Sequence, residues 1–170
     1  MNPPEPAGAL LARAYGWLME GLGLLAGLAF AAMALLIGGD VLLRNLALGN
    51  LPWVIEVAEY LLYLATFAAA PWVLYHGGHV RVDLLVTQLP PRAGRLLELL
   101  TDTVGLAICL LLAWYGARAA LEAQAIGALV FKELVLPEWP LLAVIPVAAG
   151  LLALEFVRRL ARALSSARPG

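Results

Sequence analysis

The chain has 170 residues, of which 63% are hydrophobic and 14% charged, and its mean hydropathy is +0.88. A single soluble core of this size cannot bury so much apolar surface, so most of it must face lipid or apolar protein. The formal net charge is −1 and the basic residues form no patch, which argues against a nucleic-acid-binding protein. The single cysteine, Cys109, can form no internal disulfide.

Residues 1–12 are rich in proline and read as a short N-terminal tail ahead of the first predicted membrane span, at about 15–44. The uncharged stretch of this span, from Gly21 to Gly39, holds about 19 residues and nearly matches a hydrocarbon core of roughly 30 Å. The stretch is too long for the core of a signal peptide, so we expect an uncleaved first span.

Two charged residues close the first span. Asp40 and Arg44 stand one helical turn apart with the acid first, the order that favours an ion pair within a helix. One interpretation is an interfacial pair that ends the helix. The other is that Arg44 reaches Glu56 or Glu59 on the next span, since the two helix ends lie on the same side of the membrane.

The second predicted span covers about 53–76, after a turn over residues 46–52 that contains Gly49 and Asn50. Trp53, Glu56 and Glu59 form its entrance, and nothing from Tyr60 to Tyr75 is charged. Gly77 and Gly78 suit the end of the helix, where a left-handed residue satisfies the last carbonyls.

The segment at about 79–89 is too polar to span a membrane and too apolar for an ordinary loop, so we expect an amphipathic arm at the interface. It carries His79, Arg81 and Asp83. His76 and His79 are the only histidines, and two ligands on one short segment cannot occupy opposite axial faces of a haem. No cysteine or carboxylate cluster completes a zinc set, so we expect neither a metal nor a cofactor.

The third and fourth spans are predicted at about 92–125 and 138–160. The third has a short uncharged core, Thr103 to Ala117, so some flanking charges should snorkel or face protein. Residues 128–139 read as an apolar loop that could dip into the interface, and residues 155–170 as a basic helical extension with a polar end. The predicted fold is thus an all-α integral membrane protein, with a single four-helix domain over 13–164 and a C-terminal tail over 165–170.

Basic residues predict the orientation. Eight lie on the side of the two termini and three on the other, which places both termini in the cytoplasm. The eight are Arg13, Arg81, Arg92, Arg95, Arg158, Arg159, Arg162 and Arg168, and the three are Arg44, Arg118 and Lys132.

The order of short motifs along these spans resembles the small membrane subunit (Q, DctQ-type) of TRAP, or tripartite ATP-independent periplasmic, transporters. The motifs are D-V-x-x-R at the end of the first span, W-x-x-E at the start of the second, H-V-R-V-D-L-L after it, L-P-P-R before the third, and L-x-x-P with I-P-V around the fourth. The matching residues are Asp40, Val41, Arg44, Trp53, Glu56, His79, Val80, Arg81, Val82, Asp83, Leu84, Leu85, Pro90, Pro137 and Pro146.

The resemblance implies a protein of the bacterial inner membrane that is not an enzyme. In that family a large membrane subunit carries the sodium and substrate sites, a periplasmic binding protein delivers an organic acid such as a dicarboxylate, and the small subunit braces the large one. Candidate structural or partner-interface residues are Asp40, Arg44, Trp53, Glu56, Glu59, His79, Arg81 and Asp83. The motif order also favours the alternative in which Arg44 is buried against Glu56 or Glu59.

Three other classes fit less well. A small four-span exporter that works as a dimer needs an acid deep in a span, whereas the acids here lie at the ends of the predicted spans. An electron-transfer anchor needs paired histidines on facing helices, and this sequence has none. The small membrane subunit of a tripartite tricarboxylate transporter is closer in kind, and only the motif order argues against it.

Overall fold

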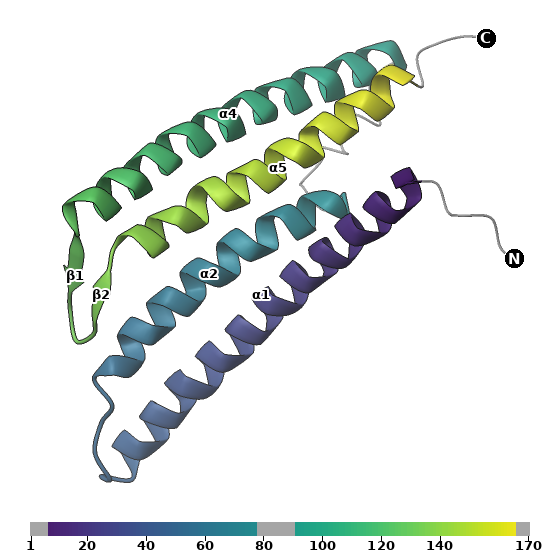
Figure 1. Cartoon of the computed structure of the whole chain (residues 1–170). Coiled ribbons are helices and arrows are strands. Elements are labelled where there is room, and N and C mark those ends of the chain that lie inside the picture. The colour runs from purple at the N-terminus through teal and green to yellow at the C-terminus, as the bar shows by residue number, and fades with distance from the viewer. Residues whose placement is uncertain (1–6, 78–90, 166–170) are drawn as a thin grey trace, which may run out of the picture. The chain divides into compact units, whose positions relative to one another are not determined.

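The computed structural model describes residues 7–77 and 91–165, and four long helices make up most of them (Figure 1). These are α1 (Ala7–Asn45), α2 (Trp53–Tyr75), α4 (Pro91–Ile126) and α5 (Trp139–Ser165). All four are long and apolar enough to cross a membrane, which confirms the predicted fold class. The predicted arm at 79–89, with His79, Arg81 and Asp83, lies outside the described residues.

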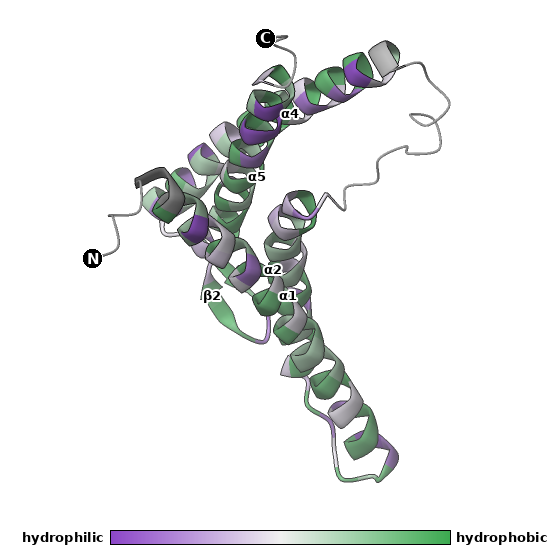
Figure 2. Ribbon diagram, turned by 90° about the vertical axis from the view of Figure 1, so that its right-hand side faces the viewer, coloured by the Kyte–Doolittle hydropathy of each residue, from purple (hydrophilic) through white to green (hydrophobic). Residues whose placement is uncertain are grey.

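The surface of the helices is apolar and their contacts are made by small residues. Leu24, Leu35 and Leu111 are more than half exposed, as expected of side chains that face lipid. The buried positions are mainly alanines, which allow helix backbones to approach closely in a membrane. They include Ala26, Ala29, Ala58, Ala65, Ala68, Ala148, Ala149 and Ala153. Figure 2 shows hydrophobic, green residues along much of α1 and α2.

Two helices end at a left-handed glycine. Gly77 has a φ of 72° and donates its N–H to the carbonyl of Leu74 at 3.1 Å, as predicted for the end of the second span. Gly127 has a φ of 64°, and the N–H groups of Gly127 and Ala128 bond back to Gln124 and Ala123. This pair of bonds is a Schellman motif, which satisfies the last carbonyls of α4.

A two-stranded hairpin replaces the loop predicted at 128–139. Strands β1 (Leu129–Phe131) and β2 (Val135–Pro137) pair antiparallel, with Leu129 opposite Pro137 and Phe131 opposite Val135. The N–H of Glu138 also donates to the carbonyl of Ala128 at 3.0 Å, which extends the pairing to the base of the hairpin. The loop prediction was wrong because strands of three residues are too short to give a clear alternating pattern in sequence.

The chain divides into two compact units, one up to Trp72 and the other from Val73. In the first, α1 and α2 lie side by side in both ribbon views (Figures 1 and 2). Gly23 of α1 faces the indole of Trp72, because a Cβ built at Gly23 would lie 2.5 Å from the ring nitrogen. The Trp72 indole N–H in turn donates to the carboxylate of Glu20 at 3.4 Å.

In the second unit, α4 and α5 pack against each other through two further glycines of α4. A Cβ at Gly105 would lie 2.6 Å from the ring of Phe156, and one at Gly116 would lie 3.0 Å from Cδ of Pro146. Cys109 is buried beside Phe156 in the apolar cluster of this unit. Helix α5 continues through Pro146, which packs against Gly116 of the neighbouring α4, and a proline is tolerated in a membrane helix where a neighbouring helix covers it.

Candidate functional site

Asp40 joins the end of α1 to the turn that follows it. Its side chain is 6% exposed, and one carboxylate oxygen accepts a hydrogen bond from the guanidinium of Arg44 at 2.7 Å. The other oxygen accepts the backbone N–H of Leu51 at 2.8 Å, two residues before α2 begins. Both oxygens are therefore satisfied, and the carboxylate fixes the path of the chain between the two helices.

Arg44 lies at the surface of this turn. Its side chain is 61% exposed, and it bonds to Asp40 on its own helix. The interpretation in which Arg44 is buried against Glu56 or Glu59 is therefore wrong, and Arg44 pairs within its own helix. The motif order correctly predicted that the end of α1 and the start of α2 are neighbours. It could not predict in which direction the long side chain of Arg44 extends.

The turn borders a shallow, open hollow of about 380 Å³ lined by Arg44, Ala47, Gly49 and Asn50. Ala47 has a φ of 53° and Gly49 a φ of 124°, so the predicted turn over 46–52 reverses the chain through two residues with positive φ. Alanine pays a steric penalty of about 1–2 kcal/mol in the left-handed region, which glycine avoids.

The two glutamates at the entrance of α2 have different surroundings. Glu56 is 5% exposed and accepts the hydroxyl hydrogen bond of Tyr60 at 2.8 Å, whereas Glu59 is exposed. Trp53, the first residue of α2, is 38% exposed. His76 is exposed and its ring meets that of Tyr75 edge-on at 5.1 Å. Asp40 and Glu56 are thus the predicted site residues that the structure buries.

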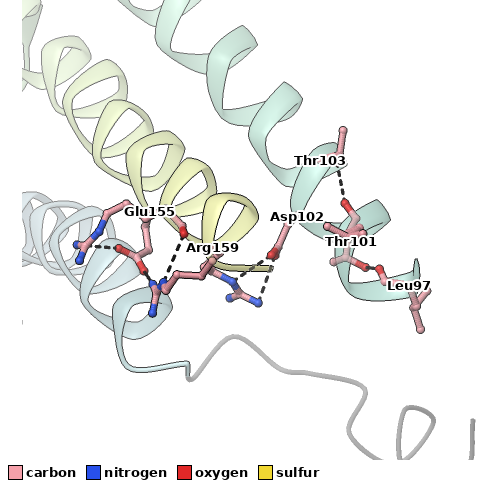
Figure 3. Close-up of polar contacts among 9 residues, drawn as sticks. Leu97, Thr101, Asp102, Thr103, Glu155 and Arg159 are labelled. Atoms are coloured by element: carbon pink, nitrogen blue, oxygen red, sulfur yellow. Dashed lines mark hydrogen bonds and ion pairs between the residues drawn. The ribbon is translucent and has the colours of Figure 1, made fainter. Parts of the chain in front are cut away.

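A second charged cluster, not predicted as a site, lies in α4 and α5 (Figure 3). Arg159 of α5 reaches Asp102 of α4, with its Nε and one terminal nitrogen each 3.2 Å from a carboxylate oxygen. The side chain of Arg159 is 19% exposed and that of Asp102 is 8% exposed, so this is a nearly buried, bidentate ion pair between two helices. It meets the expectation that some of the charges flanking the core of the third span face protein.

Glu155 is the most deeply buried acid among the described residues, at 1% exposure. It accepts bonds from Arg158 at 3.4 Å and from Arg162 at 2.8 Å, one and two turns further along α5. The sequence analysis treated this stretch as a basic extension and missed the acid. The signal was present, because positions separated by three and seven residues lie on one face of a helix.

The acids of these clusters are bonded to arginines or to backbone N–H groups. Within residues 7–77 and 91–165, no buried side-chain nitrogen or oxygen lacks a hydrogen-bond partner. The same residues contain no group of three or more His, Cys, Asp or Glu side chains that could hold a metal ion. The charged side chains of both clusters are engaged with each other rather than aimed into an enclosed cavity.

Four apolar helices, tied in pairs by charged residues near their ends, define a multi-pass helical membrane protein. A family model described as "Tripartite ATP-independent periplasmic transporters, DctQ component" matches residues 33–166. This match covers most of the chain, including both charged clusters, and the chain therefore belongs to the DctQ family of transporter components. No curated protein matches the sequence.

Proposed function

We propose that this chain is the small permease subunit of a TRAP transporter of the bacterial inner membrane. It braces a large membrane subunit that uses the sodium gradient to take up an organic acid, such as a dicarboxylate, delivered by a periplasmic binding protein. The observation that supports this role most strongly is the membership of a family of tripartite transporter components.

The helices themselves support a bracing role. Secondary transporters build their substrate and ion sites from interrupted helices near the middle of the membrane. In this chain α2 and α5 continue without a break through Pro71 and Pro146. The buried acids of the described residues, Asp40, Glu56, Asp102 and Glu155, are each bonded to a side chain of the same chain. None is left to relay an ion.

Uptake in proteoliposomes tests this proposal. Vesicles that contain this chain together with the large permease subunit, supplied with the binding protein and a sodium gradient, should accumulate the organic acid. Vesicles with this chain alone should accumulate none, and those with the large subunit alone should accumulate less. Sodium-driven uptake by this chain alone would refute the bracing role and favour the exporter.

The proposed topology places both termini in the cytoplasm, on the basis of the eight basic residues against three. The turn after α1 and the β-hairpin then face the periplasm. Reporter fusions after Asn50, Arg92, Lys132 and Gly170 should alternate outside, inside, outside, inside. A periplasmic signal from the fusion at Gly170 would overturn the topology.

A further inference from the structure

The β-hairpin between α4 and α5 presents an apolar face outward. Leu129, Phe131 and Val135 are 47%, 77% and 57% exposed, and Pro137 is also exposed. They share one face of the hairpin, because Leu129 pairs with Pro137 and Phe131 with Val135. The other face, formed by Val130 and Leu136, is partly buried. A two-stranded sheet with one face in water normally carries polar residues there, so water does not explain this face.

The position of the hairpin along the helices matches the edge of a bilayer. Asp102 and Arg159 meet at one end of the pair, and Trp139 begins α5 twenty residues before Arg159. At 1.5 Å per residue this separation is about 30 Å, the thickness of the hydrocarbon core. If the ion pair lies at one edge of the hydrocarbon, the base of the hairpin lies at the other.

The residues around the hairpin are those found where a protein meets headgroups. Trp139, at the base, is 41% exposed, and tryptophan is enriched at membrane interfaces because its ring is amphipathic. Exposed apolar side chains continue along the chain from Leu121 and Ile126 of α4 into Leu129. Lys132 and Glu133, in the turn between the strands, are both exposed. The hairpin therefore has an apolar face, an aromatic base and a charged tip.

From this pattern we propose that the hairpin lies in the headgroup region of the leaflet next to it, with Leu129, Phe131 and Val135 directed into the lipid. The apolar face of the hairpin is thus covered by the membrane lipids and not by another protein. The charged turn stays at the level of the phosphates and water. The backbone polar groups of both strands remain satisfied because they pair with each other. This assignment rests on the second unit alone and does not depend on the proposed transporter partners.

Spin-label accessibility tests the proposal in the full chain. Cys109 is the only cysteine, so replacing it by alanine gives a background for single labels. Labels are placed at Phe131→Cys and Val135→Cys on the apolar face. Matched controls are Lys132→Cys in the turn and Val147→Cys on α5, where Val147 is 65% exposed. The protein is reconstituted in vesicles of phosphatidylethanolamine and phosphatidylglycerol, and collisions with oxygen and with a water-soluble nickel chelate are measured.

Labels at positions 131 and 135 should collide more with oxygen than with nickel, at a depth between those of the two controls. Position 132 should favour nickel at least several-fold more than position 131. Nickel accessibility at position 131 equal to that at 132 would overturn the proposal, because the face would then be in water. Low collision rates with both reagents at 131, in the chain alone or after co-reconstitution with the large permease subunit, would also overturn it and assign the face to protein.

Discussion

The two helix pairs hold a nearly buried aspartate in different ways. Asp40 in the first unit pairs with an arginine of its own helix whose side chain is 61% exposed. Asp102 in the second pairs with Arg159 of the neighbouring helix, which is only 19% exposed. The acids are equally buried, at 6% and 8%, so the difference lies in the arginines. When an exposed arginine is removed, water can take its place beside the carboxylate. When a buried arginine is removed, the carboxylate is left without a partner where water has little access.

The largest effect is expected at the pair that crosses between helices. Arg159→Ala removes the partner of Asp102 and leaves a carboxylate with little access to water, which costs about 3–5 kcal/mol in such sites. We expect a steep loss of folded protein in detergent, measured by size-exclusion profile and thermal unfolding.

A double variant controls for loss of packing. Replacing both Asp102 and Arg159 by leucine leaves no stranded charge, and it should restore most of the stability, since apolar replacements of buried ion pairs are often neutral or better. If the Arg159→Ala protein unfolded at the same temperature as the wild type, this result would contradict the proposed difference between the two ion pairs.

The two pairs are alike in a second respect, because each places a glycine against an aromatic ring. Gly23→Ala and Gly105→Ala should each destabilise by about 1–3 kcal/mol, as the new methyl group would overlap Trp72 or Phe156. Thermal unfolding of the two variants measures the effect. Gly27→Ala is the matched control, since nothing lies within 4 Å of its Cβ position. In this control the gain in helix propensity, about 0.5–1 kcal/mol, should dominate. Equal shifts at positions 23 and 27 would show that the glycine contact is not a constraint.

The smallest effect is expected at Arg44. Arg44→Ala removes an exposed ion pair within one helix, which contributes about 0.2–1 kcal/mol. Asp40→Ala should be worse by about 1–3 kcal/mol, because it also removes the acceptor for the Leu51 N–H. Chemical unfolding of both variants gives the comparison. If Arg44→Ala proves the more damaging of the two, the arginine has a partner other than Asp40.

The sequence predicted the parts of this fold that depend on local pattern. Uncharged runs of sufficient length indicated the four helices, and Gly77 indicated the end of α2, because span length and left-handed glycines act locally. The bond of Asp40 to Leu51, the pairing of Asp102 with Arg159 and the burial of Glu155 were not predicted. Each depends on which face of a helix meets its neighbour, and spacing along one helix does not determine that. Arg44 shows the same limit, since its long side chain can turn to Asp40 on its own helix or to the glutamates of the next one.

The most direct test of the bracing role is the composition of the complex that this protein forms in its own membrane. The chain, carrying a C-terminal affinity tag, would be extracted in mild detergent and its complex analysed by native mass spectrometry. We predict that it co-purifies with one much larger multi-span permease, and that Gly23→Ala and Arg159→Ala lower the yield of that complex while Gly27→Ala does not. Recovery of the chain only as a dimer of itself would contradict the account.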